Sequence, residues 1–390
     1  MLTEALKNHL TQDILPFWLH LADREKGGWH GYVGMNLQVD KDYFKGCILH
    51  SRILWTFSTA ARLLGNPEYF EAAKHALHFM EKFADHEHGG VFWSVTPDGV
   101  PLDTTKHTYC QAFAVYGLSA YARATGDKAA LDRAMELFEI IEGPCSDEGG
   151  YGEAFNADFT PAGNEKLSDN PKLMERGETA ARTMNTLLHV LEAYAELYRA
   201  GKDERVRQAG AKCLERFLHV MYSPAQRRLE VFYDKDYRSL LDMQSYGHDI
   251  EGSWLIWDAV EAMIPEAEQA PYRAMCIDLA DAVHARAFTD AGVDNEIVEG
   301  EVENTRVWWV QGESLLGFDN AWRLTGEEKF AKAAEHQWEV LKRFIIDPRE
   351  GSEWFGYATI EGEPIAKPIV DEWKCPYHNG RMCLRMIEKE

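Results

Sequence analysis

The 390-residue sequence is poor in several features that would each indicate a particular class of protein. Its seven cysteines are scattered and form no Cys-x-x-Cys pair, so neither a disulfide framework nor a zinc ribbon is expected. No apolar run reaches the roughly 18 residues of a membrane span, and the first residues lack the basic and apolar regions of a signal peptide. We therefore expect a cytoplasmic protein that has no membrane partner.

Basic residues are scarce relative to acidic ones: 41 Lys and Arg against 64 Asp and Glu give a formal net charge of −23. Such a surface repels nucleic acid, so none is expected as a partner. No glycine-rich phosphate-binding motif follows a strand, and we expect no nucleotide or redox cofactor. The 12 Trp, 16 Tyr and 18 Phe are plentiful. They would fill a core, and flat rings also suit the apolar faces of sugars.

A pattern of paired helices recurs six times with a period of roughly 60 residues. Each pair has a one-sided amphipathic helix, a break rich in Gly and aromatic residues, and a second helix that is apolar on more faces. The amphipathic helices are expected at 2–21, 67–83, 128–141, 203–221, 270–288 and 327–344. The more apolar helices are expected at 46–64, 106–125, 178–200, 246–264, 306–325 and 376–390.

Helical hairpins of this kind cannot bury their apolar faces alone, so they must stack. Six pairs predict an all-α (α/α)6 barrel that forms one domain over residues 1–390, with the apolar helices inside. An open solenoid is the competing architecture, but no repeat is obviously polar enough to cap one. The breaks would gather as short hairpins or loops at the N-terminal ends of the inner helices and would wall a cleft there. Helix dipoles at that end favour developing negative charge.

The inner helices carry polar residues that an ordinary core would not contain. The stretch from Ser245 to Glu251 reads as a helix start, with His248 and Glu251 three residues apart on one face. His189 and His378 lie on two other inner helices, and Arg52 lies on a fourth. One buried histidine is more often structural than catalytic, but three histidines with an arginine and a glutamate indicate a site for proton transfer.

Other candidates are weaker. Residues 85–88, Asp-His-Glu-His, resemble a metal cluster but are interpreted as a solvated turn. His248 and Glu251 are half of a possible metal site but lack the His-Glu-x-x-His form, so no metal is expected. Glycoside hydrolysis would need two carboxylates across the cleft, and Asp103, Asp249, Glu251, Glu313 and Glu353 are available. The histidines would then be surplus.

Proton abstraction beside a carbonyl uses these residues better. One imidazole would remove the C2 proton of an open-chain aldose and a second would return a proton, while an arginine stabilises the enediolate. Return to the opposite face of C2 gives the epimer, whereas delivery to C1 gives the ketose.

Four strings, at residues 45–55, 183–192, 245–251 and 373–381, resemble cellobiose 2-epimerases of the N-acylglucosamine 2-epimerase superfamily. Residues 92–95 and 101–113 strengthen a likeness that covers essentially the whole chain. The family's fold is an (α/α)6 barrel. The residues of 177–182 cannot be matched to the family's pattern, so contacts from that segment are left open.

The resemblance implies roles for single residues. His248 and His378 would be the acid/base pair at C2, and His189 would handle protons near the ring oxygen or the C1 hydroxyl. Glu251 would orient His248 or assist ring opening, and Arg52 would stabilise the enediolate. The expected sugar contacts are Tyr109, Asn185, Trp309 and Trp373, with Trp308 as an alternative because the sequence does not decide which of the adjacent tryptophans faces the cleft.

The expected activity is cofactor-independent epimerisation at C2 of the reducing-end glucose of β-1,4-linked disaccharides: cellobiose first, then lactose and mannobiose. Three alternatives stay open: a mannose isomerase or N-acylglucosamine 2-epimerase, an (α/α)6 glycosidase, and a sugar-binding barrel with structural histidines. Apart from the disaccharide no partner is indicated, and a monomer is expected.

Overall fold

The computed structural model describes residues 2–390, and its long helices alternate between two types along the chain. The outer helices are α1, η1 and α2 (Leu2–His9, Leu10–Ile14, Leu15–His20), α4 with η2 (Pro67–Met80, Glu81–Phe83), α6 (Lys128–Glu142), α9 with η3 (Glu204–Arg216, Phe217–Met221), α11 (Ala270–Arg286), and α13 with η5 (Glu328–Val340, Leu341–Ile345). The inner helices are α3 (Cys47–Leu64), α5 (Thr108–Thr125), α8 (Met184–Gly201), α10 (Tyr246–Met263), α12 (Trp308–Thr325) and α14 (His378–Glu388).

Local sequence explains where these helices begin and end. The side chains of Asn66, Asp127 and Asp203 accept hydrogen bonds from backbone N–H groups in the first turns of α4, α6 and α9. Inner helices α3 and α5 end at Gly65 and Gly126, whose φ angles of 67° and 76° lie in the left-handed region that glycine adopts without strain.

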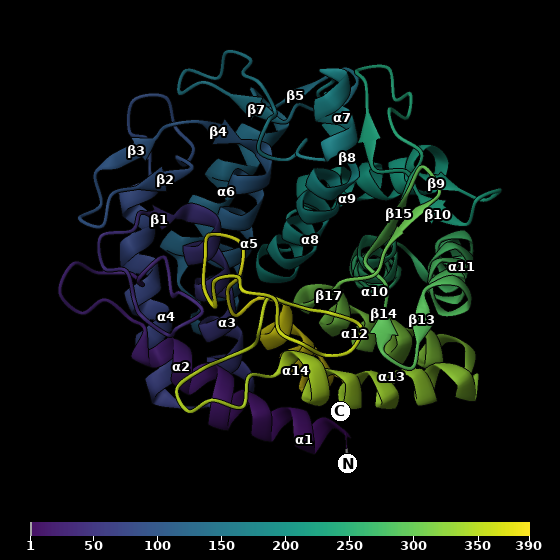
Figure 1. Ribbon diagram of the computed structural model, residues 1–390. Helices are drawn as coiled ribbons and strands as arrows, with labels where there is room; N and C mark the ends of the chain where they lie inside the picture. The colour runs from purple at the N-terminus through teal and green to yellow at the C-terminus, as the bar shows by residue number, and fades with distance from the viewer. Residues whose placement is uncertain (1) are drawn as a thin grey trace.

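The inner helices form a closed ring. Each one packs against the next, from α3 through α5, α8, α10 and α12 to α14, and α14 returns to α3. The outer helices surround this ring, and α1 packs against α14 at its lower edge in Figure 1. The chain is therefore an (α/α)6 barrel, as its repeat predicted. None of the helices formed by residues 2–390 is both long and apolar enough to cross a bilayer.

Short antiparallel strands join the breaks at one end of the barrel. A strand just before an inner helix pairs with a strand in the break that precedes the next inner helix. The pairs are β1 (Lys45–Gly46) with β2 (Ser94–Val95), β4 (Lys106–His107) with β7 (Ala154–Phe155), β8 (Arg182–Thr183) with β11 (Phe232–Tyr233), β12 (Met243–Ser245) with β15 (Glu296–Val298), and β17 (Arg306–Val307) with β18 (Tyr357–Ala358). A bridge between Val33 and Val370 completes the circle. The inner-helix N-termini are thus held in register around one opening.

The remaining strands extend these breaks or close tight hairpins beside them. β3 (Pro101–Asp103) pairs with β2, and β16 (Glu301–Glu303) pairs with β15. The hairpins are β5 (Ser146–Asp147) with β6 (Gly150–Tyr151), β9 (Tyr222–Ser223) with β10 (Arg228–Leu229), and β13 (Phe288–Thr289) with β14 (Gly292–Val293). The turns of the β5–β6 and β13–β14 hairpins contain aspartate and glycine, which accept compact backbone conformations.

One predicted helix boundary is wrong. The helix expected from residue 178 begins at Met184, because Thr183 is its N-cap and accepts a hydrogen bond from the N–H of Thr186 at 3.1 Å. Arg182 therefore lies in β8 rather than on the inner helix, and its side chain binds Asp147. A short helix that was not predicted, α7 (Pro171–Arg176), precedes β8 in the chain.

Ion pairs close the opposite end of the barrel. Arg123 of α5 binds Glu196 of α8 and Glu388 of α14, at 3.2 and 3.3 Å. Arg385 of α14 lies 3.5 Å from Asp258 of α10. The arginines stand near the C-terminal ends of their helices, where the helix dipole favours positive charge. We call this end the floor of the barrel. Its ion pairs are structural, which leaves the other end for binding.

Candidate active site

A cavity of about 460 Å³ opens at the end of the barrel where the strand-paired breaks gather. The long segment between η5 and α14, yellow-green to yellow in Figure 1, contributes residues to its wall. The cavity is lined by all ten residues that the sequence indicated: Arg52, Tyr109, Asn185, His189, His248, Glu251, Trp308, Trp309, Trp373 and His378. The fold therefore brings the predicted site together in one place.

His248 and His378 both lie close to one aromatic ring, that of Trp309. The ring centroids of Trp309 and His248 are 4.9 Å apart, and those of Trp309 and His378 are 5.5 Å apart. Trp308 packs edge-on against His378 at 5.2 Å and is buried, whereas Trp309 is half-buried. Both tryptophans line the cavity, so the two were not alternatives.

His378 is held by a carboxylate. Its Nδ1 lies 2.7 Å from Oε1 of Glu313, which reaches it from α12, and Oε2 of Glu313 accepts a hydrogen bond from Trp254 Nε1 at 2.8 Å. Burial lowers the pKa of His378 well below its usual value and raises that of Glu313. With Nδ1 donating to the carboxylate, the other ring nitrogen, Nε2, keeps a lone pair that can accept a proton.

His248 has a neutral partner instead. Its Nδ1 lies 2.8 Å from the hydroxyl of Ser245, the residue that also caps α10. The hydroxyl can donate to Nδ1 or accept from it, so His248 can carry its proton on either nitrogen. Burial lowers the pKa of His248 to about 4, although the nearby charge of Glu251 acts to raise it. Burial therefore favours the neutral form of this imidazole, which can act as a base.

His189 is held by Glu192, one turn further along α8, through a 2.9 Å contact between Nδ1 and Oε2. The same carboxylate oxygen accepts a hydrogen bond from the Tyr377 hydroxyl. Burial alone would raise the pKa of Glu192, but the charge of Arg381, 2.5 Å away, outweighs it and lowers that pKa below its usual value. An ionised carboxylate thus stands behind His189.

Arg52 is a buried cation that has no carboxylate within ion-pair distance among residues 2–390. Its guanidinium lies over the rings of Phe113 and Tyr377, at 4.2 and 4.5 Å, and donates to the Tyr109 hydroxyl at 2.9 Å. Its Nε has no hydrogen-bond partner. Cation–π contacts hold the charge in place without neutralising it, so the group is ready to face an anion in the cavity.

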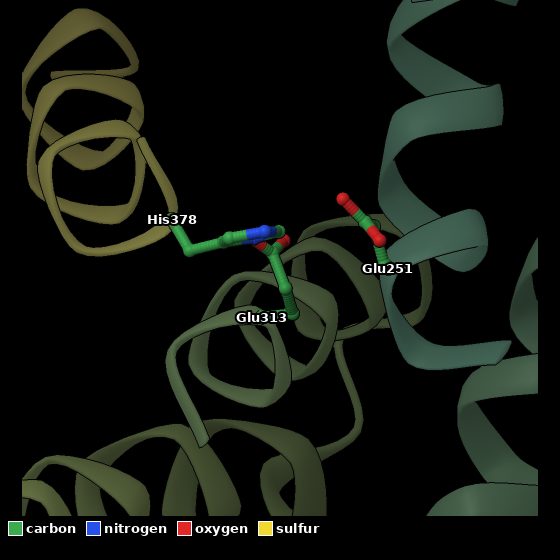
Figure 2. A group of neighbouring side chains, drawn as sticks. All are labelled: Glu251, Glu313 and His378. Atoms are coloured by element: carbon green, nitrogen blue, oxygen red, sulfur yellow. The ribbon is translucent and has the colours of Figure 1, made fainter. Parts of the chain in front are cut away.

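Glu251, Glu313 and His378 project toward one another from three different helices (Figure 2). One ligand atom from each lies within 4.8 Å of the others, which would suit a metal ion by distance alone. However, a guanidinium is already present: Arg381 Nη2 donates to Oε1 of Glu313 at 2.8 Å and to Oε1 of Glu251. The positive charge that these carboxylates face is that of Arg381.

Asn185 supplies an unused acceptor. Its half-buried side chain lines the cavity, and its Oδ1 atom is buried without a hydrogen-bond partner. A buried unpaired acceptor is costly, so it favours a ligand that brings a hydroxyl. Trp373 also lines the cavity and is half-buried, with its ring 6.0 Å from that of Tyr109.

The turn at residues 85–88 lies outside this cavity. His86, Glu87 and His88 are exposed, as expected for a solvated turn. Asp85 is not solvated: it is buried and binds Lys106 Nζ at 2.6 Å. An ion pair between the turn and β4 explains why an acidic residue begins this segment.

Sequence reasoning missed the residues that contact the histidines from the side away from the cavity or bind those contacts. Glu192, Tyr377 and Arg381 were not predicted, and Glu313 was considered only as a carboxylate for hydrolysis. The spacing of His189 and Glu192 on one face of an apolar helix was an available signal. Glu296, on the cavity wall, was also missed; burial and the neighbouring charges of Glu303 and Asp169 raise its pKa to about 7.

Comparison with known proteins agrees with this geometry. Residues 38–380 match the family model for N-acylglucosamine 2-epimerase. The chain is 43% identical to a cellobiose 2-epimerase of Ruminococcus albus over 391 residues, covering 100% of this chain and 99% of that protein. A cellobiose 2-epimerase structure from Bacillus thermoamylovorans superposes with a TM-score of 0.96 at 41% identity, covering 100% and 99% of the two chains. A D-mannose isomerase structure (TM-score 0.86, 18% identity, coverage 99% and 98%) shares the fold.

Proposed function

This chain belongs to the N-acylglucosamine 2-epimerase family and is a carbohydrate epimerase, and we propose that it inverts C2 of the reducing-end glucose in β-1,4-linked disaccharides. Cellobiose would be converted to 4-O-β-glucosyl-mannose without a cofactor, and lactose and mannobiose are further substrates. The observation that carries this proposal is the placement of two imidazoles, those of His248 and His378, beside the same ring of Trp309 in one cavity.

The chemistry starts from the open-chain sugar, which His189 and Glu251 help to form by moving protons at the ring oxygen and the C1 hydroxyl. A neutral imidazole then takes the C2 proton, and the electrons of the C–H bond pass into a cis-enediolate whose negative charge rests on the C1 oxygen. The other histidine gives a proton to the opposite face of C2, and the carbonyl re-forms. Each turnover thus moves one proton off C2 and one proton on, so that no redox partner is needed.

The two histidines suit opposite halves of this exchange. His378 donates through Nδ1 to Glu313 and so presents a basic Nε2, in the way a carboxylate orients a catalytic imidazole. His248, held by the Ser245 hydroxyl, can present either a lone pair or a proton. In the reverse reaction, from mannose to glucose configuration, the roles exchange.

Arg52 supports the intermediate. A guanidinium with no ion-pair partner in a dry site stabilises an oxyanion more strongly than one that is already neutralised. Its fixed position over Phe113 and Tyr377 means that little reorganisation accompanies the development of charge.

The aromatic and amide side chains would bind the sugar. Trp309 and Trp373 offer flat faces to pyranose rings, and Asn185 and Tyr109 offer hydrogen bonds to hydroxyl groups. The cavity volume of about 460 Å³ lies in the range of small-molecule sites.

An NMR assay in D2O with cellobiose and EDTA-treated protein tests the proposal. We expect a mannose-type anomeric signal, deuterium at C2 and no free glucose. Conversion of mannose to fructose without action on cellobiose would replace the proposal with a monosaccharide isomerase, and release of glucose would indicate a glycosidase. His248→Asn and His378→Asn serve as controls. Both should lose the activity while keeping their fold; retained activity in either would refute the two-histidine mechanism.

A further inference from the structure

Arg381 lies beneath the histidines at the centre of three carboxylates. It is fully buried in the first turn of α14, between the rings of Tyr377 and Trp254 at 4.0 and 4.8 Å. Nη1 donates to Glu192, and Nη2 donates to both Glu251 and Glu313. Burial acts to lower the pKa of Arg381, but these carboxylates raise it well above its usual value, so the group stays charged.

Each of the three carboxylates is associated with one histidine. Glu192 contacts Nδ1 of His189, and Glu313 contacts Nδ1 of His378. Glu251 lies one turn beyond His248 on α10, and its charge acts to raise the pKa of that histidine. A single guanidinium is therefore shared by the groups that control all three imidazoles.

Counting the buried charges shows why this sharing matters. The three carboxylates pair with Arg381 alone, and Arg52 is a second buried guanidinium that forms no ion pair; together these five groups carry one net negative charge when all are ionised. Glu296, the cross-strand neighbour of Ser245, also lines the cavity, and its pKa is raised to about 7. The remaining titratable groups near the cluster are neutral or paired: burial raises the pKa values of three phenols and one thiol, and Lys374 is paired with Glu353. The phenols are those of Tyr109 and Tyr116 on α5 and of Tyr377 just before α14, and the thiol is that of Cys375. One proton on the histidines would balance the remaining charge.

We propose that Arg381 is a positioning residue whose single charge, divided among Glu192, Glu251 and Glu313, sets how many protons the three histidines hold. This inference rests on the proposed function, in which one imidazole must be neutral while another carries the proton that C2 will receive. With more negative charge in the cluster, the imidazole that must act as a base would also become protonated. With less negative charge, the imidazole that must act as an acid would lose its proton. Arg381 holds the site between these two states.

Titration of the histidines by NMR in 13C-histidine-labelled, ligand-free protein tests this role. Arg381→Gln removes one positive charge a few ångströms from the imidazoles, so their titration midpoints should rise by ~1–2 pH units. The acidic limb of kcat/KM for cellobiose should move upward by the same amount. Arg385→Gln is the matched control, because Arg385 is a buried arginine one turn further along α14 that pairs with Asp258. It should shift the midpoints by less than about 0.5 pH unit.

A folded Arg381→Gln variant whose midpoints move no more than those of Arg385→Gln would overturn the proposal. If Arg381→Gln does not fold, Glu192→Gln decides the question. Glu192 contacts His189 and not His378, yet removal of its charge should lower the titration midpoint of His378 through Arg381. An unchanged His378 midpoint in Glu192→Gln would contradict the proposal. The titration needs no substrate, so it distinguishes failure of this inference from failure to act on cellobiose.

Discussion

Replacing Glu313 with glutamine should disable His378 through hydrogen-bond geometry, with almost no change in side-chain volume. The carboxylate accepts at both oxygens: Oε1 from His378 Nδ1 at 2.7 Å and Arg381 Nη2 at 2.8 Å, and Oε2 from Trp254 Nε1 at 2.8 Å. A glutamine amide has one acceptor oxygen and one NH2 donor. In either orientation, its NH2 group meets a donor that needs an acceptor.

The expected losses follow from these contacts. If the NH2 group faces His378, the imidazole must turn its lone pair to Nδ1, and Nε2 becomes protonated and unable to act as a base. Wrong-tautomer substitutions of this kind lower kcat by about 10²–10⁴-fold. If the NH2 group faces Trp254 instead, a buried donor loses its acceptor, and the free energy of unfolding should fall by about 1–3 kcal/mol. Loss of the negative charge also lowers the pKa of His378, so the acidic limb of kcat/KM should move to lower pH.

Steady-state epimerisation kinetics across pH and urea unfolding measure these effects together. Glu196→Gln is the matched control, since Glu196 is also buried and ion-paired but lies at the floor of the barrel. It should lose stability and keep kcat. A folded Glu313→Gln variant that keeps both the wild-type free energy of unfolding and more than about one-tenth of the wild-type kcat would refute the reasoning.

Three further predictions concern other parts of the site and the core. Arg52→Met should lower kcat by about 10²–10³-fold, measured in the same assay, because the oxyanion loses a preorganised charge; an unchanged kcat would remove Arg52 from the mechanism. Trp373→Ala should raise KM about 10-fold and change kcat less, with Trp373→Phe close to wild type, since a stacking face is lost; equal effects of both variants on kcat would contradict a binding role. Burial lowers the pKa of His50 to about 3, so the unfolded chain binds a proton that the folded chain does not. The contribution of His50 to the free energy of unfolding should therefore fall by about 1.4 kcal/mol per pH unit as pH drops from 6.5 toward 3. In urea unfolding, the free energy of unfolding of His50→Gln should depend less steeply on pH than that of the wild type.

Much of the barrel could be predicted because its determinants are local. The alternation of amphipathic and more apolar helices follows from side-chain periodicity, and the outer helices begin at residues such as Asn66 and Asp127 whose capping needs only nearby backbone groups. Where capping and strand pairing compete, prediction failed: Arg182 looked helical from its neighbours, but pairing of β8 with β11 placed it in a strand.

The candidate site divides in the same way. The sequence by itself determined that His189, His248, His378 and Arg52 lie on inner helices, because a polar residue within an apolar helix is visible in one dimension. Which partners they meet was decided only by the tertiary structure. Glu313 contacts His378 across 65 residues, and Arg381 contacts Glu192 across 189. Such pairs form only when ring closure brings α8, α10, α12 and α14 around one point, and no local pattern encodes that meeting.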